Sequence, residues 1–261
     1  MYASNFYENA ALNLMRGQSV SAPSTLYLAL FLSNPGDTGS EGTEISYSGY
    51  ERQVITFSAP AASGSGLMVQ NTSLISFAEA SSSAGTVTYV GVFDSSLPGS
   101  GNMWLYAPLD MGLVVQNGVS PVFRAGGIKF ILSGNFSSYY RNQILNILRG
   151  TNCVGFAPYL ALCNGDPTAS GSEFSGGDYA RIAVTMGAPS QQASGAALSV
   201  NISDAMSNIS TANWGSLTHA AIYDAETGGS PFAIVDLGRS YAAPIGTAMG
   251  VHAGDLQISF N

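Results

Sequence analysis

The chain repeats itself once along its length, and this feature constrains its fold more than any other. Residues 12–17 (LNLMRG) match residues 145–150 (LNILRG) at an offset of 133. Further blocks match in the same order at offsets between 128 and 132: YLAL at 27–30 and 159–162, YERQVITFSAP at 50–60 and YARIAVTMGAP at 179–189, GTVTYVGVFD at 85–94 and GSLTHAAIYD at 215–224, and the pairs Ala125-Gly126 and Ala253-Gly254. A period of this length is the size of a domain and too long for a solenoid unit. The sequence therefore predicts two tandem copies of one domain, residues 1–135 and 136–261.

Each copy is expected to open with a short helix. In each copy three apolar residues recur at four-residue spacing and would share one helical face: Phe6, Ala10 and Leu14, then Tyr140, Ile144 and Leu148. Ser4 and Ser138 are the predicted N-caps. Gly17 and Gly150 each follow an arginine and would supply the left-handed residue that ends the helix.

After each helix the pattern changes to short runs rich in Val, Ile, Thr, Tyr and Phe, separated by Gly, Pro, Ser and Asn. The runs are 25–32, 52–57, 86–93, 103–107 and 128–132 in the first copy, and 159–163, 181–186, 216–223, 232–236 and 256–260 in the second. Strands at this spacing indicate antiparallel sheets. No helical pattern alternates with them, which argues against a doubly wound parallel sheet. The predicted fold is mainly β: two tandem antiparallel β-sandwich domains, jelly-roll-like, each preceded by a short helix.

Charged residues are scarce. They make up 9% of the chain, with a net charge of −8, against about 25% charged residues in an average protein. This balance excludes a generic nucleic-acid binder, which needs a basic patch, and it argues against docking to anionic lipid. The apolar run at residues 26–32 is too short to span a membrane, and residues 1–17 lack the pattern of a signal peptide. An apolar, charge-poor chain suits extensive packing against partners, although its 31 glycines and many serines could also keep it soluble.

The two cysteines, Cys153 and Cys163, are too few for a disulfide scaffold. Cys163 ends an apolar run, and we interpret it as a small buried hydrophobe. A bridge between the two cysteines is the less favoured alternative.

A tyrosine and an arginine two residues apart occur at the same place in both copies, as Tyr50 and Arg52 and as Tyr179 and Arg181. This spacing places each pair on one face of a strand. In a chain with so few cations, an arginine at both positions indicates a partner for its guanidinium. A carboxylate of the same domain is favoured and a neighbouring subunit is the alternative, so these four residues are candidate interface residues.

Four further residues are interface candidates. Asp94 and Asp224 follow equivalent strands. Aspartates in this position cap turns, and a binding role is the alternative. Trp104 and Trp214 lie at non-equivalent positions, where they would belong to the core if buried and could stack on sugar rings if exposed.

The sequence contains no pattern typical of catalysis or metal binding. His219 and His252 each lack a histidine at the matching position, and no Cys, His or acidic residues stand at metal-ligand spacing. Neither a nucleophile elbow nor a phosphate-binding loop occurs. The acidic loops at 34–49 and 164–178 share no carboxylate spacing, and we interpret them as ordinary exposed loops instead of calcium sites. We therefore expect no catalytic residues, no cofactor, no metal and no enzyme activity.

The order of motifs resembles a domain of tailed-bacteriophage tail-fibre-like and virion-associated structural proteins. The segments that carry the resemblance are SAPST at 21–25, GGDYAR at 176–181, WGSLTH at 214–219, IYD at 222–224 and AGD at 253–255. The first copy departs from it, because Ala84 replaces the tryptophan and Tyr89 replaces the histidine. The resemblance implies a non-enzymatic structural component of the virion, such as a tail fibre, collar or decoration protein, made in the host cytoplasm.

The resemblance also sets expectations about partners. A tandem duplicate could turn a trimer into a pseudo-hexamer, so we expect a homo-oligomer, trimer or hexamer, attached to capsid, collar or tail proteins. The alternative function is a receptor-binding module that recognises host surface glycans through aromatic and Asp/Asn-rich loops. Neither nucleic acid nor membrane is expected as a partner.

Overall fold

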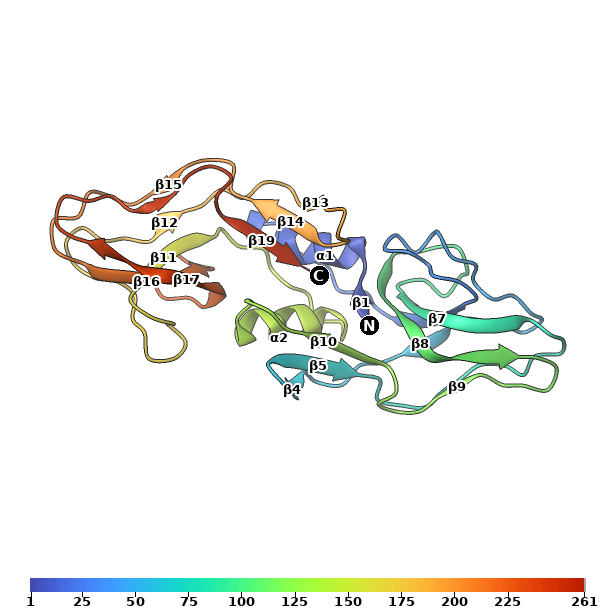
Figure 1. Cartoon of the computed structure of the whole chain (residues 1–261). Coiled ribbons are helices and arrows are strands. Elements are labelled where there is room, and N and C mark those ends of the chain that lie inside the picture. The colour runs from blue at the N-terminus through green and yellow to red at the C-terminus, as the bar shows by residue number, and fades with distance from the viewer. Residues whose placement is uncertain (261) are drawn as a thin grey trace.

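The computed structural model describes residues 1–260 and consists of short antiparallel strands with two α-helices. Two larger sheets lie at opposite ends of the molecule, and the helices lie between them with two small sheets (Figure 1). The predicted fold class, mainly β with antiparallel sheets and a short helix at the start of the chain, is confirmed.

The larger sheet of the first repeat has the strand order β1-β8-β7-β2-β3, and that of the second has the order β12-β11-β16-β17. The strands of the first are Tyr2–Ala3, Met103–Val115, Gly85–Phe93, Leu26–Phe31 and Gln53–Ile55, and those of the second are Ile182–Ala183, Tyr159–Cys163, Gly215–Tyr223 and Pro231–Ala243. An isolated bridge between Phe136 and Ala233 takes the place that β1 occupies in the first repeat. The two sheets therefore share one topology.

Each repeat also has a small three-stranded sheet and a two-stranded ribbon. The small sheets have the orders β10-β5-β4 (Lys129–Leu132, Gly66–Gln70, Ala61–Ser63) and β13-β14-β19 (Ser190–Gln191, Ala197–Val200, Gln257–Phe260). The ribbons pair β6 with β9 (Ile75–Ser76, Val122–Phe123) and β15 with β18 (Ala205–Met206, Gly250–Val251). In β10, Phe130 and Leu132 are buried while Lys129 and Ile131 are exposed, the two-residue alternation of a sheet with one buried face.

The long strands β8 and β17 continue well beyond the predicted runs, and each contains a wide bulge. Val87 pairs with Leu113 and Tyr89 pairs with Pro108, so four residues of β8 lie opposite one of β7. In the second repeat four residues of β17 likewise lie opposite Thr218 of β16. The bulged segments are residues 109–112 and 237–240.

Helix α1 (Asn5–Asn13) continues into a 3₁₀ turn (Leu14–Arg16), and α2 spans Ser138–Ile147. Ser4 caps α1 as predicted, but Ser137 and not Ser138 caps α2, by accepting the Tyr140 amide at 3.1 Å. The left-handed glycines at the helix ends are confirmed, with φ of 74° at Gly17 and 83° at Gly150.

The predicted buried face is correct for α2, whereas in α1 only Leu14 of the three predicted residues is buried. Tyr140, Ile144 and Leu148 are buried, whereas Phe6 is 39% exposed. In α1 the residues equivalent to the first two are Tyr7 and Ala11, and both are fully buried. Four-residue spacing alone does not decide between two registers that differ by one residue, because both contain apolar side chains.

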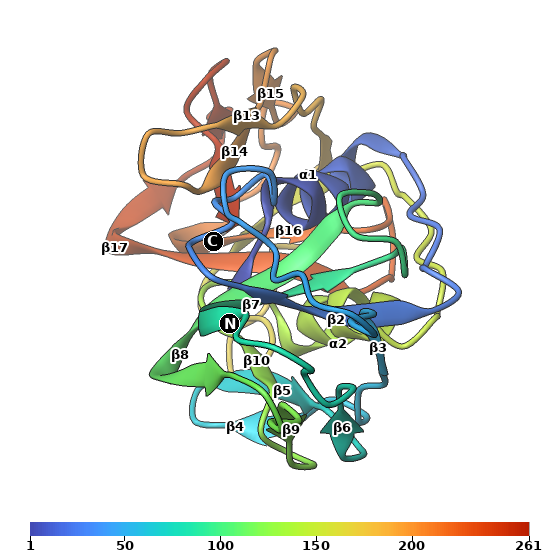
Figure 2. The same ribbon diagram turned by 90° about the vertical axis from the view of Figure 1, so that its right-hand side faces the viewer.

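The two helices are exchanged between the repeats. Helix α1 packs on β8 of its own repeat and on β14 and β19 of the second repeat. Helix α2 packs on β17 of its own repeat and on β5 of the first. Figures 1 and 2 show the same arrangement from two sides, with α1 beside β14 and α2 beside β5. Each small sheet is therefore covered by the helix of the other repeat.

Equivalent residues make reciprocal contacts across this junction. The Tyr7 hydroxyl donates to the Ile144 carbonyl at 2.8 Å, and the Tyr140 hydroxyl donates to the Ala11 carbonyl at 2.6 Å. Val20 and Cys153 exchange both backbone hydrogen bonds as an antiparallel bridge. Such reciprocity defines an approximate twofold axis, the symmetry of an isologous dimer. The hydrophobic core runs continuously through both repeats, so the two repeats are packed as one body. The boundary between residues 135 and 136 stays a prediction.

Candidate functional site

The guanidinium of Arg52 lies at the centre of a polar cluster in the first repeat. It makes a bidentate ion pair with Glu44, with Nε–Oε1 at 2.9 Å and Nη2–Oε2 at 2.8 Å. Its Nη1 donates to the carbonyls of Ser95 and Ser100 at 3.0 and 2.9 Å, and its plane stacks on Phe93 at 3.9 Å. Charge-assisted bidentate pairs are among the stronger hydrogen-bonded contacts, so this cluster fastens the loops at one end of the sheet to each other.

Tyr50 completes the cluster. Its hydroxyl donates to Glu44 at 2.9 Å and accepts the Leu30 amide at 3.1 Å. Burial raises the pKa of the Tyr50 hydroxyl, and the Glu44 carboxylate raises it further, which keeps the phenol a hydrogen-bond donor.

The second repeat builds the same cluster. Arg181 pairs with Glu173 at 2.9 and 2.8 Å, donates to the Ala225 and Gly228 carbonyls, and stacks on Tyr223 at 3.5 Å. The Tyr179 hydroxyl donates to Glu173 at 3.0 Å. Burial alone would lower the pKa of Arg181, but the hydrogen bond and the charge of Glu173 outweigh it and raise that pKa.

Both arginines therefore have the intradomain carboxylate partner that the sequence favoured. The side chain of Arg52 is 1% exposed and that of Arg181 is 8% exposed. A role of these residues in an interface stays a prediction, and their burial leaves little guanidinium surface for it.

Sequence reasoning missed the two glutamates, because the acidic loops were expected to share no carboxylate spacing. The spacing that the two copies share joins a glutamate to an arginine: Glu44 precedes Arg52 by eight residues, and Glu173 precedes Arg181 by the same eight. The repeated pattern Glu-x5-Tyr-x-Arg was the available signal. Among residues 1–260, no three His, Cys, Asp or Glu side chains come together in a way that could hold a metal ion.

Asp94 caps a turn and holds a tryptophan. Its carboxylate accepts the Asn102 amide at 2.7 Å and the indole Nε1 of Trp104 at 3.3 Å. Trp104 is 2% exposed and packs on Phe6 and Tyr7 of α1. These two candidates lie together, and the tryptophan belongs to the core.

In the second repeat the corresponding residues are arranged differently. Asp224 accepts the Ser230 amide at 2.7 Å, but Phe232 stands in place of Trp104 and offers no indole donor. Trp214 is 7% exposed, packs on Phe174 and Tyr179, and donates to the Gly176 carbonyl at 3.0 Å. The structure therefore places Trp214 beside the Arg181 cluster and apart from Asp224.

Asp224 lines a pocket of about 380 Å³, which we call the aromatic pocket. Its wall includes Tyr139, Phe156 and Phe232, together with the amides of Gln143 and Asn152. Tyr139 is 45% exposed. Aromatic faces beside a carboxylate and amide groups form the kind of lining that can hold a small polar ligand.

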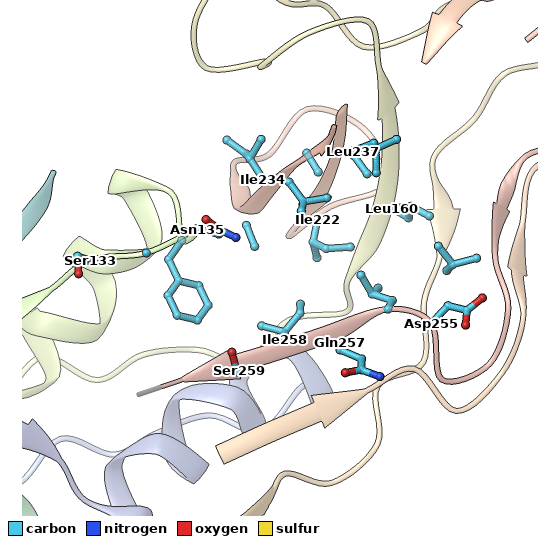
Figure 3. Close-up of a pocket in the computed structure, with 18 residues that line it drawn as sticks. Ser133, Asn135, Leu160, Ile222, Ile234, Leu237, Asp255, Gln257, Ile258 and Ser259 are labelled. Carbon is cyan, nitrogen blue, oxygen red and sulfur yellow. The ribbon is translucent and has the colours of Figure 1, made fainter. Parts of the chain in front are cut away.

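A second and larger hollow of about 620 Å³, which we call the apolar pocket, lies between β19 and the β16–β17 hairpin (Figure 3). Leu160, Ile222, Ile234 and Ile258 line it, and Asp255 lies on its rim. It is within the volume range of small-ligand sites.

Both cysteines are buried and carry free thiols, so the alternative of a disulfide between Cys153 and Cys163 is wrong. Burial raises the pKa of the Cys163 thiol to about 12. The helices within residues 1–260 are too short and polar to cross a membrane.

The sequence of each repeat matches a class of bacteriophage fibre proteins. Residues 2–131 and residues 135–259 each match the same family model. The chain belongs to the Gp80 family, described as Podophage GP4 fiber I protein gp80. The expected membership among tail-fibre-like phage proteins with two tandem domains is thereby confirmed. No curated protein matches the chain.

Proposed function

We propose that the chain is a non-enzymatic structural subunit of a phage fibre, which assembles with copies of itself and attaches to capsid, collar or tail proteins of the virion. The observation that carries this proposal is a long, largely unpaired sheet edge in each repeat. Such edges present backbone donors and acceptors to another chain.

Each edge is exposed over most of its length. The outer side of β8 pairs with β1 only at Leu105 and Tyr106, and that of β17 meets Phe136 only at Ala233, among the residues that the structure describes. Beyond these points apolar side chains face solvent, with exposed fractions of 84% at Met111 and 40% at Val235.

The bulged segments next to these edges differ in charge. The bulge of β8 carries Asp110, and that of β17 carries Arg239. Opposite charges on two otherwise equivalent features favour contact between the first repeat of one copy and the second repeat of another. This complementarity supports a homo-oligomer, for which we propose a trimer or a hexamer.

The test is the mass of the purified chain by light scattering over a range of concentrations. We expect a trimer or hexamer for the natural sequence and a smaller species for the double variant Met111→Lys with Val235→Lys. Leu97→Lys is the matched control, since Leu97 is 67% exposed and lies in the turn before β8, at the end of that strand where β1 already pairs with it. A natural chain that stays monomeric and binds no virion component would refute the proposal.

The aromatic pocket favours a second candidate function, the recognition of host surface glycans. Its lining includes the half-buried carboxylate of Asp224 and the exposed ring of Tyr139. Such pairs suit a sugar ring, which offers hydroxyls at its edge and C–H groups on its face. A glycan array with the natural chain, Asp224→Asn and Tyr139→Ala tests this function. Hits that both variants lose would support it, and an array without hits would leave the structural function alone.

A further inference from the structure

The apolar pocket lies in the second repeat, and the first repeat has the same strands around the equivalent place. At three positions of its lining the first repeat holds larger side chains, with Val90, Leu105 and Phe130 where the second has Ala220, Ala233 and Ile258. At two others the order is reversed, with Ala3 and Ala107 where the second has Phe136 and Val235. Those three larger residues are 1%, 0% and 2% exposed. Buried side chains of the first repeat therefore occupy space that belongs to the apolar pocket in the second.

The chain also shows what kind of group fills this space. In the first repeat, Tyr2 and Ala3 pair with β8, and the Met1 side chain packs against the core. The Met1 nitrogen donates to the carbonyl of Lys129 in β10 at 3.2 Å. An extended segment with a methionine side chain thus closes the groove between the larger sheet and the small sheet.

The second repeat lacks this closure. The bridge of Phe136 with Ala233 matches that of Ala3 with Leu105, so Gly134 stands at the position of Met1. Gly134 has no side chain, and it lines the apolar pocket.

The strand beside the pocket is an edge strand. Among the described residues, β19 is paired with β14 alone, and Gln257, Ile258 and Ser259 of β19 line the pocket (Figure 3). Asp255 on the rim adds a negative charge where the first repeat has Gly127. A sheet edge next to an apolar pocket is the arrangement used to bind extended peptides, in which the backbone pairs with the edge and alternate side chains enter pockets.

We propose that the apolar pocket binds an extended segment of a partner protein. The segment places one methionine- or leucine-sized side chain in the pocket, pairs its backbone with the free edge of β19, and carries a positive charge near Asp255. This site shares Val235 of β17 with the proposed self-assembly edge, so the two proposals are distinguished by their measurements: the mass in solution tests self-assembly, and the isoleucine signals test the binding of the peptide.

The experiment is a titration of the full chain, labelled with ¹³C at isoleucine methyl groups, with the peptide amide Met-Tyr-Ala-Ser-Asn. This peptide has the sequence of residues 1–5 and supplies a methionine side chain, an extended backbone for the edge of β19 and a free amine as the positive charge. The place beside β17 that corresponds to Tyr2 and Ala3 is already held by Asn135 and Phe136. We expect saturable shifts of the Ile222, Ile234 and Ile258 signals. The peptide Ser-Tyr-Ala-Ser-Asn should bind about 10-fold to 100-fold more weakly, because it lacks the buried methionine side chain.

Two variants of the chain complete the test. Ala220→Val with Ala233→Leu introduces the first repeat's residues and should abolish the shifts, whereas Ala193→Leu, at an exposed loop position, should leave them unchanged. If the spectrum of the free double variant shows that its fold has changed, the comparison of the two peptides on the natural chain is the test instead. The proposal is overturned if millimolar Met-Tyr-Ala-Ser-Asn gives no shifts, or if the serine peptide binds equally well.

Discussion

Glu8 connects the exchanged helix α1 to the second repeat, and its protonation should control stability. It is 1% exposed and accepts the Ala197 amide of β14 at 2.9 Å. Burial raises the pKa of its carboxyl from 4.5 to about 8, and the nearby Asp37 carboxylate contributes to the increase, although the hydrogen bonds from Ala197 and Gln191 oppose it. The folded chain therefore holds this proton more tightly than the unfolded chain does.

The sign of the pH dependence follows from this increase. The contribution of Glu8 to stability is complete below pH 4.5 and is lost as the pH rises towards 8. At about 1.36 kcal/mol per pH unit, this interval corresponds to at most about 5 kcal/mol. Glu8→Gln keeps an oxygen that can accept the Ala197 amide and removes the titration.

The measurement is urea unfolding of the natural chain and of Glu8→Gln between pH 5 and pH 9. The two should be similar in stability at pH 5, and the variant should be more stable by several kcal/mol at pH 9. Glu51→Gln, at an exposed position, is the control and should follow the natural chain. Parallel curves for the natural chain and Glu8→Gln over the whole range would refute the reasoning.

Three other predictions concern the core and the clusters. Tyr7→Phe and Tyr140→Phe should each lower the free energy of unfolding by about 1 kcal/mol in urea, because each removes one buried interhelical hydrogen bond; a change in only one of the two would contradict the twofold equivalence. Arg52→Ala should cost about 3–5 kcal/mol, because it leaves the largely covered Glu44 carboxylate without its cation, and Arg181→Ala should cost less, because its partner is more exposed (23% against 12%); equal losses would argue against burial as the cause. The Cys163 thiol should react slowly with iodoacetamide in the folded chain and rapidly after unfolding, and mass spectrometry should then count two alkylated cysteines; the absence of both labels would indicate a disulfide.

The sequence predicted those strands and helices whose own residues show the apolar pattern typical of the element. The strands at 159–163 and 216–223 are apolar runs next to turn residues, and they were found nearly to the residue. The far half of β8 was missed because its Pro, Asp and Gly residues do not resemble a strand, and it is held by pairing with β7. The two-residue strand Ser190–Gln191 is polar and exposed, and only its pairing with β14 makes it a strand.

The exchange of helices between the repeats could not be predicted from the sequence, for a different reason. Both helices present similar apolar faces and both small sheets present similar apolar surfaces, so the sequence does not distinguish a helix that covers its own sheet from one that covers the other. Only tertiary geometry decides between these pairings. Of the candidate site, the pairing of Arg52 and Arg181 with carboxylates was foreseen, whereas the pockets depend on small differences in side-chain size between aligned positions, such as Ala233 against Leu105.

The central claim is that the two repeats form one body through exchanged helices, and it is tested most directly by cutting the chain. Residues 1–134 and 135–261 would be produced as separate polypeptides and examined alone and mixed, by light scattering and by thermal unfolding. The exchange predicts that the mixture forms a one-to-one complex that unfolds in a single transition, and that each segment alone is unfolded or self-associates to cover its small sheet. If each segment alone is a folded monomer with the same stability as in the mixture, the claim is wrong.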